Sequence, residues 1–227
     1  MSRKLTKEIT RTLLLMLILF CFFSMPAAAG QIITKQRLVV LDPGHGGNDM
    51  GTVTATGLKE KEITLELAQM IQQELADTYR VLLTRSTDIR RLPVERTAFA
   101  NQNRAVLFIS IHLHALQTPK ALFFYYDLPM NGINDKETWQ HQSIDHKTDS
   151  KRMAVLAAGQ FQRHKPKFKT EILTAPAIPL EGMLMPGILI EPFSISQIPI
   201  TALDREAFLT PYANILAKSI SLYFRSM

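Results

Sequence analysis

Short apolar runs alternate with amphipathic stretches along most of the chain. The apolar runs predict buried strands at 37–41, 80–84, 105–111, 122–126 and 187–191. Apolar positions at helical spacing predict helices at about 60–79, 93–102, 149–162 and 203–223. Buried strands that alternate with helices are typical of an α/β fold. We therefore expect a single layered domain with a mostly parallel sheet flanked by helices.

The first 29 residues have a different pattern. Residues 1–11 carry four basic side chains against one acidic side chain, an apolar run follows at 13–23, and Ala27-Ala28-Ala29 closes the segment. These features predict a secretory signal peptide over 1–29. The run is shorter than the roughly 20 residues that a spanning helix needs. We expect cleavage after Ala29 and export to the periplasm or cell envelope, with membrane attachment only if the segment stays uncleaved.

Composition narrows the function of the remaining domain, 30–227. The formal net charge is +6, and the predicted signal peptide contributes three of these units. Because the exported part is only mildly basic, we expect no nucleic-acid partner. The single cysteine, Cys21, also lies in the signal peptide. The exported domain is therefore expected to have no thiol nucleophile and no thiolate ligand for a metal.

Polar side chains stand where the predicted strands end. The turn Asp42-Pro43-Gly44 follows the first strand, and His45 comes directly after it. His112 stands at the end of the third strand, and Glu191 stands at the end of the last. The carboxyl ends of parallel strands share one edge of a sheet. Glu60, at the start of the next helix, falls on its inward face. Two imidazoles and a carboxylate form a catalytic zinc set that leaves one position for water. Taken singly, a loop histidine and a helix-start glutamate also have ordinary structural explanations.

The order of these motifs along the chain is similar to that of a known enzyme family. The block Asp42-Pro43-Gly44-His45-Gly46-Gly47, followed by Glu60-Lys61-Glu62 and Ser110-Ile111-His112, resembles the zinc-dependent N-acetylmuramoyl-L-alanine amidases of the amidase_3 type. The resemblance covers most of 37–223 and is close up to about residue 115. It implies a twisted sheet flanked by helices, and Zn²⁺ held by His45, Glu60 and His112. It also implies that Glu191 is the catalytic carboxylate.

The activity implied by the resemblance is hydrolysis of the amide between N-acetylmuramic acid and L-alanine of the peptidoglycan stem peptide. Peptidoglycan would be the partner, and a protein activator is left open. Two other functions also stay open. One is a non-catalytic peptidoglycan-binding module of the same fold, and the other is a zinc peptidase that acts on wall peptides.

Several residues around this set have an open role or depart from the family pattern. Asp42 is expected either to orient a ligand imidazole or to stabilise its turn. His114 stands where the family commonly has Asn and shares a strand face with His112. We expect it to replace the hydrogen bonds of that Asn, with an oxyanion donor or extra ligand as alternatives. Pro192-Phe193-Ser194 replaces a usual Gly-Phe pair and changes the wall beside Glu191.

Two further groups are assigned from the sequence. Arg85, Asp88 and Arg96 are expected to form a structural charged cluster that ties the second strand to the next helix. Residues 127–152 are polar and contain the only tryptophan. They are expected to form a solvated surface loop, or alternatively an insertion that acts as a lid or regulatory segment. The histidines in that stretch, His141 and His146, are expected to be exposed and not to bind metal.

Overall fold

The computed structural model describes residues 37–127 and 139–227. The predicted signal peptide and residues 128–138 of the polar segment lie outside this description. A six-stranded sheet forms the centre of the described domain. Its strands are β1 (Leu38–Pro43), β2 (Arg80–Leu83), β3 (Leu107–Ile111), β4 (Lys120–Tyr126), β5 (Lys169–Ala175) and β6 (Gly187–Glu191).

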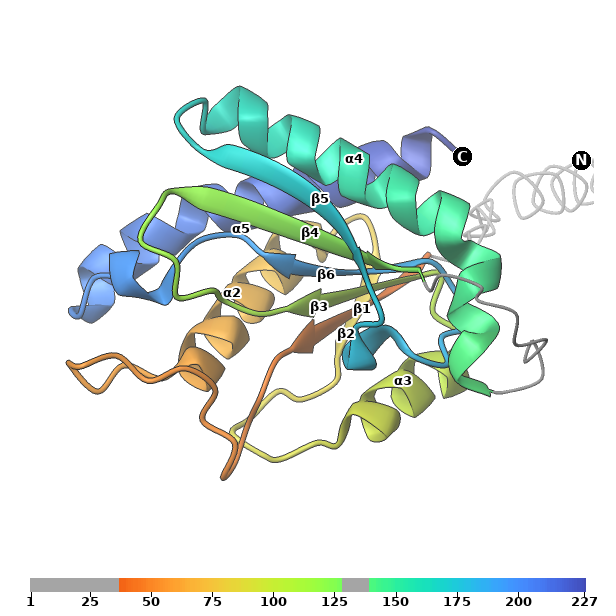
Figure 1. Cartoon of the computed structure of the whole chain (residues 1–227), viewed down its shortest axis with the longest axis horizontal. Coiled ribbons are helices and arrows are strands. Elements are labelled where there is room, and N and C mark those ends of the chain that lie inside the picture. The colour runs from red at the N-terminus through yellow and green to blue at the C-terminus, as the bar shows by residue number, and fades with distance from the viewer. Residues whose placement is uncertain (1–36, 128–138) are drawn as a thin grey trace, which may run out of the picture. The chain divides into compact units, whose positions relative to one another are not determined.

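The strand order is β2-β1-β3-β6-β4-β5 (Figure 1). Strands β2, β1, β3 and β6 are parallel to one another, which confirms the mostly parallel sheet. Strand β4 is antiparallel to β6, and β5 is parallel to β4. Because of this reversal, the amino-terminal ends of β4 and β5 lie at the same edge as the carboxyl ends of the other four strands. We call this edge the catalytic edge.

Helices cover both faces of the sheet. The α-helices are α2 (Glu60–Leu75), α3 (Pro93–Gln102), α4 (Lys147–His164) and α5 (Ala202–Arg225), and the short 3₁₀ helices are η1 (Trp139–His146), η2 (Ile178–Leu180) and η3 (Ile195–Gln197). One core lies between the sheet and α2, α4 and α5, and a smaller core lies under α3 and η2. None of the described helices combines the length and the apolar character that crossing a bilayer requires.

Local sequence explains where the helices begin. Pro93 opens α3, where its missing N–H costs nothing, and the Glu95 carboxylate accepts the N–H of Leu92 at 2.7 Å. Thr201 caps α5 by accepting the N–H of Asp204. Helix α2 begins at Glu60, with acidic residues in its first turn that complement the helix dipole. This start places Glu60 next to the carboxyl ends of β1 and β3.

The sequence did not predict β5. Its residues, Lys169–Ala175, mix charged, hydroxyl and apolar side chains, and most are exposed or half-exposed. A strand at the edge of a sheet does not need a continuous apolar run, because it contacts the core through few side chains. Because β5 lacks a continuous apolar run, the pattern that predicted the other strands does not indicate it.

The polar segment 127–152 departs from the end of β4. That end pairs with the beginning of β6, at the edge of the sheet opposite the catalytic edge. Ser143 in η1 donates to the carbonyl of Leu180 and accepts the N–H of Met183. From residue 139 onward the segment is helical and not the expected loop: η1 packs beside η2, away from the catalytic edge, and 147–152 form the beginning of α4. Residues 128–138, on which the lid hypothesis depends, lie outside the description, as does the side chain of His141.

Candidate metal and catalytic site

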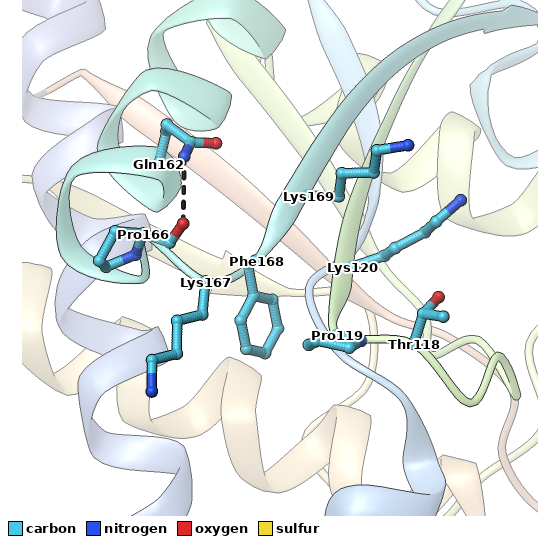
Figure 2. A pocket seen from close by; sticks show the side chains of 8 residues that line it. All are labelled: Thr118, Pro119, Lys120, Gln162, Pro166, Lys167, Phe168 and Lys169. Carbon is cyan, nitrogen blue, oxygen red and sulfur yellow. Dashed lines mark hydrogen bonds between the residues drawn. The ribbon is translucent and has the colours of Figure 1, made fainter.

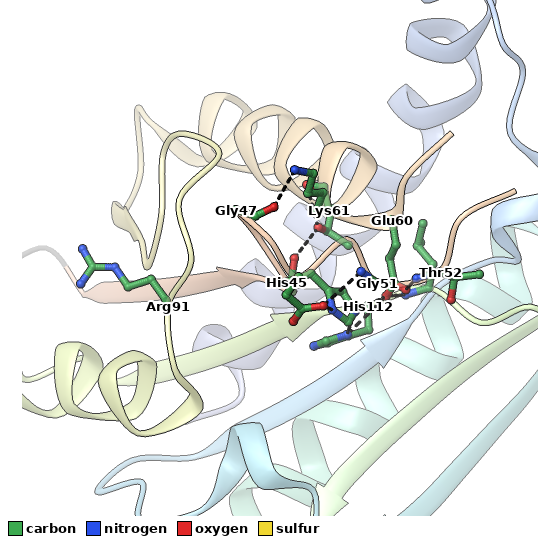
Figure 3. A network of polar contacts seen from close by, with 12 residues as sticks. His45, Gly47, Gly51, Thr52, Glu60, Lys61, Arg91 and His112 are labelled. Carbon is green, nitrogen blue, oxygen red and sulfur yellow. Dashed lines mark hydrogen bonds and ion pairs between the residues drawn. The ribbon is translucent and has the colours of Figure 1, made fainter. Parts of the chain in front are cut away.

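Three side chains converge at the catalytic edge. His45 comes from the loop after β1, Glu60 from the first turn of α2, and His112 from the end of β3 (Figure 3). Glu60 Oε1 lies 3.1 Å from His45 Nε2 and 3.3 Å from His112 Nδ1, and the two ring nitrogens are 3.2 Å apart. One ligand atom from each of the three residues lies within 4.8 Å of the others. The described residues therefore contain a His-Glu-His cluster that could bind a metal.

The carboxylate of Glu60 is held by the backbone on both oxygens. Oε2 accepts the N–H of Thr52 and Oε1 accepts the N–H of Leu113, each at 2.9 Å. One donor comes from the loop before α2 and the other from the end of β3, so the carboxylate joins two segments that are distant in sequence. Its side chain is buried. Its orientation is thus fixed by the chain itself.

His45 is oriented through its other ring nitrogen. Nδ1 donates to Asp49 Oδ1 at 2.8 Å, and Nε2 faces Glu60 Oε1. A carboxylate that holds a ligand imidazole in this way fixes its tautomer and raises its basicity. The backbone of His45 is in the left-handed region, with φ of 63°, which is unusual for a residue with a side chain. Arg96 Nη2 donates to the carbonyl of His45 at 2.7 Å and holds this conformation.

Two glycines give the ligands room. A Cβ on Gly44 would lie 2.5 Å from Cε1 of the His112 ring. Gly51 has φ of 63°, and a Cβ there would lie 2.6 Å from the ring of His45. Any side chain at either position would displace the ring of His112 or His45, so the arrangement of the cluster requires glycine at both.

A buried network of polar groups stabilises the loop that carries His45. Asp42 is fully buried; Oδ1 accepts from Thr84 Oγ1 and from Arg96 Nη1 at 2.8 Å, and Oδ2 accepts from Ser110 Oγ at 2.8 Å. Neither oxygen contacts an imidazole among the described residues. Of the two roles left open for Asp42, these contacts support stabilisation of the strand ends.

The remaining charged residues also support the loop. Arg85 is buried and donates to the carbonyls of Pro43, Gly44 and Lys61. Burial and the nearby positive charge of Arg96 lower the pKa of Arg85 to about 10. Lys61 Nζ donates to Asp88 at 2.6 Å and to the carbonyl of Gly47 at 2.8 Å. Arg85, Asp88 and Arg96 thus have structural contacts, as expected, but not with one another: Asp88 pairs with Lys61 of α2, Arg96 with Asp42 of β1, and Arg85 with backbone carbonyls around the loop that carries His45.

Glu191 is the last residue of β6 and lies at the same edge. Its neighbour Ile190 accepts the N–H of His112 at 2.9 Å, so Glu191 stands beside His112 in the sheet. Its side chain is half-buried. Burial raises the pKa of Glu191, and the negative charge of Glu60 adds to this, while His112 acts in the opposite direction.

The charges of the cluster are coupled. Burial alone would raise the pKa of Glu60, but hydrogen bonds from His112, His45 and the N–H of Thr52 outweigh it and hold the pKa far below its usual range. Burial alone would lower the pKa of His45, but the carboxylates of Glu60 and Asp49 outweigh it and raise the pKa. The site thus holds a permanent negative charge on Glu60, which suits the binding of a cation.

His114 has local partners. Its Nδ1 accepts the N–H of Leu116 at 3.2 Å, and its Nε2 donates to the carbonyl of Lys120 at 3.0 Å. Both ring nitrogens are therefore used on the loop between β3 and β4. These contacts agree with the expected structural role, and they leave no free nitrogen for a metal or an oxyanion.

The residues after Glu191 turn into the core. Phe193 is buried, and its ring lies 4.5 Å from that of Tyr212 and 5.1 Å from that of Phe208, both in α5. Ser194 caps η3 by accepting the N–H of Ser196. The departure from the family pattern at 192–194 thus anchors the end of β6 to α5.

The structure brings together His45, Glu60, His112 and Glu191, which the sequence singled out, and leaves Asp42 and His114 in supporting positions. Sequence reasoning missed Asp49. The sequence shows only that Asp49 lies four residues after His45 in a glycine-rich loop. Outside a helix, this spacing does not determine whether two side chains meet. His146, which was expected to be exposed, is half-buried at the end of η1, and it is not part of the cluster.

Comparison with known proteins agrees with the sequence resemblance. The endolysin of Bacillus phage SPP1 is 34% identical over 119 residues, which are 52% of this chain and 43% of that protein. The N-acetylmuramoyl-L-alanine amidase AmiA of Escherichia coli K12 is 40% identical over 87 residues, 38% of this chain and 30% of that protein. The chain therefore spans less than half the length of these two relatives.

A solved structure shares the fold. The catalytic domain of CwlV, an N-acetylmuramoyl-L-alanine amidase from Bacillus (Paenibacillus) polymyxa, superimposes with a TM-score of 0.66 at 22% identity, covering 83% of this chain and 98% of that one. A family model described as N-acetylmuramoyl-L-alanine amidase matches residues 39–220. Because this match covers most of the chain and includes every residue of the cluster, the chain belongs to the Amidase_3 family.

Proposed function

We propose that this chain is a zinc hydrolase that cleaves the amide between N-acetylmuramic acid and L-alanine of peptidoglycan stem peptides. The observation that carries the proposal is the convergence of His45, Glu60 and His112 beside Glu191 at one edge of the sheet. Family membership supports the same substrate. Export to the periplasm or cell envelope, where peptidoglycan lies, belongs to the proposal, and an activating protein is compatible with it.

The cluster fits a zinc ion by its chemistry. Two neutral imidazole nitrogens and one carboxylate are the donors found in catalytic zinc sites with an open position. His45 Nε2, His112 Nδ1 and a Glu60 oxygen would hold the ion, and Asp49 would keep the proton of His45 on Nδ1. When bound, zinc supplies a water of lowered pKa and polarisation of the scissile carbonyl.

Glu191 would act as the general base and then as the general acid in this reaction. Its carboxylate takes a proton from the attacking water and returns it to the amine of L-alanine as that group leaves. Both roles require a pKa between that of an ordinary carboxylic acid and neutrality, because the group has to accept and then donate. The raised pKa of Glu191 agrees with this requirement.

The test is digestion of purified sacculi, followed by mass analysis of the products. The chain, with zinc, should release stem peptides that begin with L-alanine and leave glycan strands with free lactyl groups. A chelator should abolish the release, and Glu191→Gln should slow it by about 10²- to 10⁴-fold. Glu206→Gln, which alters an exposed carboxylate on α5, is the matched control.

Two outcomes would contradict the proposal. Binding to sacculi that does not depend on metal and yields no products would indicate a non-catalytic module. Cleavage within the stem peptide would indicate a zinc peptidase that acts on wall peptides.

A further inference from the structure

The strands have a second end, which the candidate site does not use. The amino-terminal ends of β1, β2, β3 and β6 and the carboxyl ends of β4 and β5 meet there, opposite the catalytic edge (Figure 1). We call it the distal edge. Strand β1 begins at this edge with Leu38, so the chain that precedes residue 37 joins the described domain here. Anything that holds the chain by its first residues therefore holds the domain by the distal edge.

Exposed apolar side chains lie at the distal edge. Trp139, 46% exposed, is the only tryptophan of the chain and packs on Gly182, where an added Cβ would meet its ring. Leu184, 54% exposed, lies two residues after Gly182 and three before β6. Val106, 37% exposed, precedes β3 and donates its N–H to the carbonyl of Leu38. An exposed indole with aliphatic side chains at the same end of a domain suits the membrane–water interface, where tryptophan is enriched.

Arginines stand at the same edge. Arg37 precedes β1, Arg80 is the first residue of β2, and Arg104 lies three residues before β3. Arg225 is the last residue of α5, and this helix ends beside Arg37, whose guanidinium donates to the carbonyl of Phe224. All four arginines are exposed, and none has a carboxylate within ion-pair distance in the described parts of the chain. Their charges are therefore available to an anionic surface.

Charge and apolar exposure alone do not distinguish the two edges. Lys167 and Lys169, around the beginning of β5, are exposed at the catalytic edge (Figure 2). Ile200 and Leu203, around the beginning of α5, are 66% and 78% exposed there. At the distal edge, part of the arginine charge is offset by the carboxylates of Asp77, Asp145 and Glu181. What differs is the attachment of the chain, which is at the distal edge.

The sequence before the domain indicates what this edge meets. The apolar run 13–23 favours a bilayer, and the 13 residues 24–36 separate it from the domain. Fully extended, these residues span at most about 43–47 Å. While residues 1–29 are retained, the distal edge thus stays close to the lipid that holds the run. A short tether gives a high effective concentration, so weak contacts suffice for docking.

We propose that the distal edge is a docking surface for an anionic lipid bilayer in the chain that keeps residues 1–29. Trp139 lies at the membrane–water interface, and the four arginines face the lipid phosphates. The His-Glu-His cluster then points away from the membrane, at a height set by the length of β1, whose six residues span about 20 Å. The inference goes beyond the proposed function and does not depend on it.

The single tryptophan makes docking measurable in the full chain. The chain is reconstituted with vesicles of equal parts phosphatidylcholine and phosphatidylglycerol, whose acyl chains are either ordinary or brominated. Flotation of the vesicles shows that the chain is attached to them. Bromine quenches an indole that lies against the acyl chains, so the fluorescence lifetimes of Trp139 give the ratio of docked to undocked domains. Brominated lipid should quench most of the Trp139 emission of the wild-type chain.

One pair of matched variants tests the apolar contacts. Val106→Thr/Leu184→Ser removes apolar surface from the distal edge and should lower the ratio of docked to undocked domains about tenfold. Ile200→Thr/Leu203→Ser makes the same kind of change at the catalytic edge and should leave the ratio unaltered. Circular dichroism checks that both variants fold.

A second pair tests the charges, at positions whose exposure leaves folding unaffected. Arg104→Gln/Arg225→Gln should lower the ratio about tenfold in the anionic vesicles and leave it unaltered in vesicles of phosphatidylcholine alone. Lys167→Gln/Lys169→Gln, which removes two cations from the catalytic edge, should leave the ratio unaltered in both (Figure 2). Added salt should act on the wild-type chain in the same direction as the arginine variant.

Several results would overturn docking at the distal edge. The chain could fail to float with the vesicles, or float with them while Trp139 stays unquenched; the latter is also expected if the edge binds a membrane protein in place of lipid. Distal-edge variants that dock as well as their catalytic-edge controls would overturn it too. No readout uses zinc or hydrolysis, so the proposed function is decided separately by the digestion of sacculi.

Discussion

Substitution of the buried Asp42 tests what stabilises the loop that carries His45. Asp42→Ala removes the acceptor for Thr84, Ser110 and Arg96 at once. The guanidinium of Arg96, whose side chain is only 6% exposed, would then lack its sole carboxylate partner among the described residues. Removing one partner of a buried ion pair costs about 3–5 kcal/mol, since the other charge stays buried. We expect the free energy of unfolding to fall by this amount.

Asp42→Asn separates charge from hydrogen bonding. The amide oxygen can still accept from Arg96 and Thr84, and the amide nitrogen can donate to Ser110, whose hydroxyl is able to reverse its role. The hydrogen bonds are kept and only the charge is lost. The cost should therefore be smaller, about 1–3 kcal/mol.

Urea unfolding followed by circular dichroism measures both variants. The slope with urea should be unchanged, because the surface exposed on unfolding is the same. Asp77→Ala, at an exposed residue after α2, is the control and should change the free energy of unfolding by less than about 0.5 kcal/mol. A loss below about 1 kcal/mol for Asp42→Ala, or equal losses for the two Asp42 variants, would refute the reasoning.

Three further predictions concern the site. Asp49→Ala should weaken zinc binding about 10- to 100-fold in competition with a chelating dye, while Asp77→Ala should not; equal affinities would contradict the role of Asp49 in orienting its imidazole. Gly44→Ala should fold, by circular dichroism, but bind zinc more weakly, since its Cβ would lie 2.5 Å from the His112 ring; unaltered affinity would show that the ring is free to move. Glu191 must be ionised to accept a proton, so kcat should fall as the pH drops through a pKa above 4.5, and a profile flat down to pH 4.5 would exclude it as the base.

The elements of the fold with strong local signals were predictable from sequence. The helix 93–102 was predicted with its observed bounds, because Pro93 marks its start. Helix α2 was predicted to run to about residue 79 but ends at Leu75, where the chain turns to enter β2. Apolar periodicity does not register this turn, because Tyr79 continues the pattern while packing against α5. Apart from β5, which it missed, the prediction identified the strands and α-helices that exist and was less accurate on where they end.

The sequence did not predict that β4 runs antiparallel to β6. A parallel and an antiparallel strand buried on both faces have the same apolar pattern, and only pairing distinguishes them. The ligand set was more accessible, because His45 and His112 follow strands that really are parallel neighbours. The juxtaposition of Lys120 and Lys169, in contrast, depends on the pairing of β4 with β5. Lys120 and Lys169 are 49 positions apart and carry no sequence signal of their pairing.

Because β4 runs antiparallel to β6, the segment that follows β4 lies at the end of the sheet opposite the candidate site. Asp127 and Trp139, which flank the segment 128–138, belong to the edge opposite His45 and His112. Trp139 packs on Gly182, whose carbonyl accepts from Asn101 at the end of α3. Changes in length or composition there do not alter the strand ends that carry the ligands. A fluorescent label attached at this edge would therefore lie at the opposite end of the strands from the residues of the cluster.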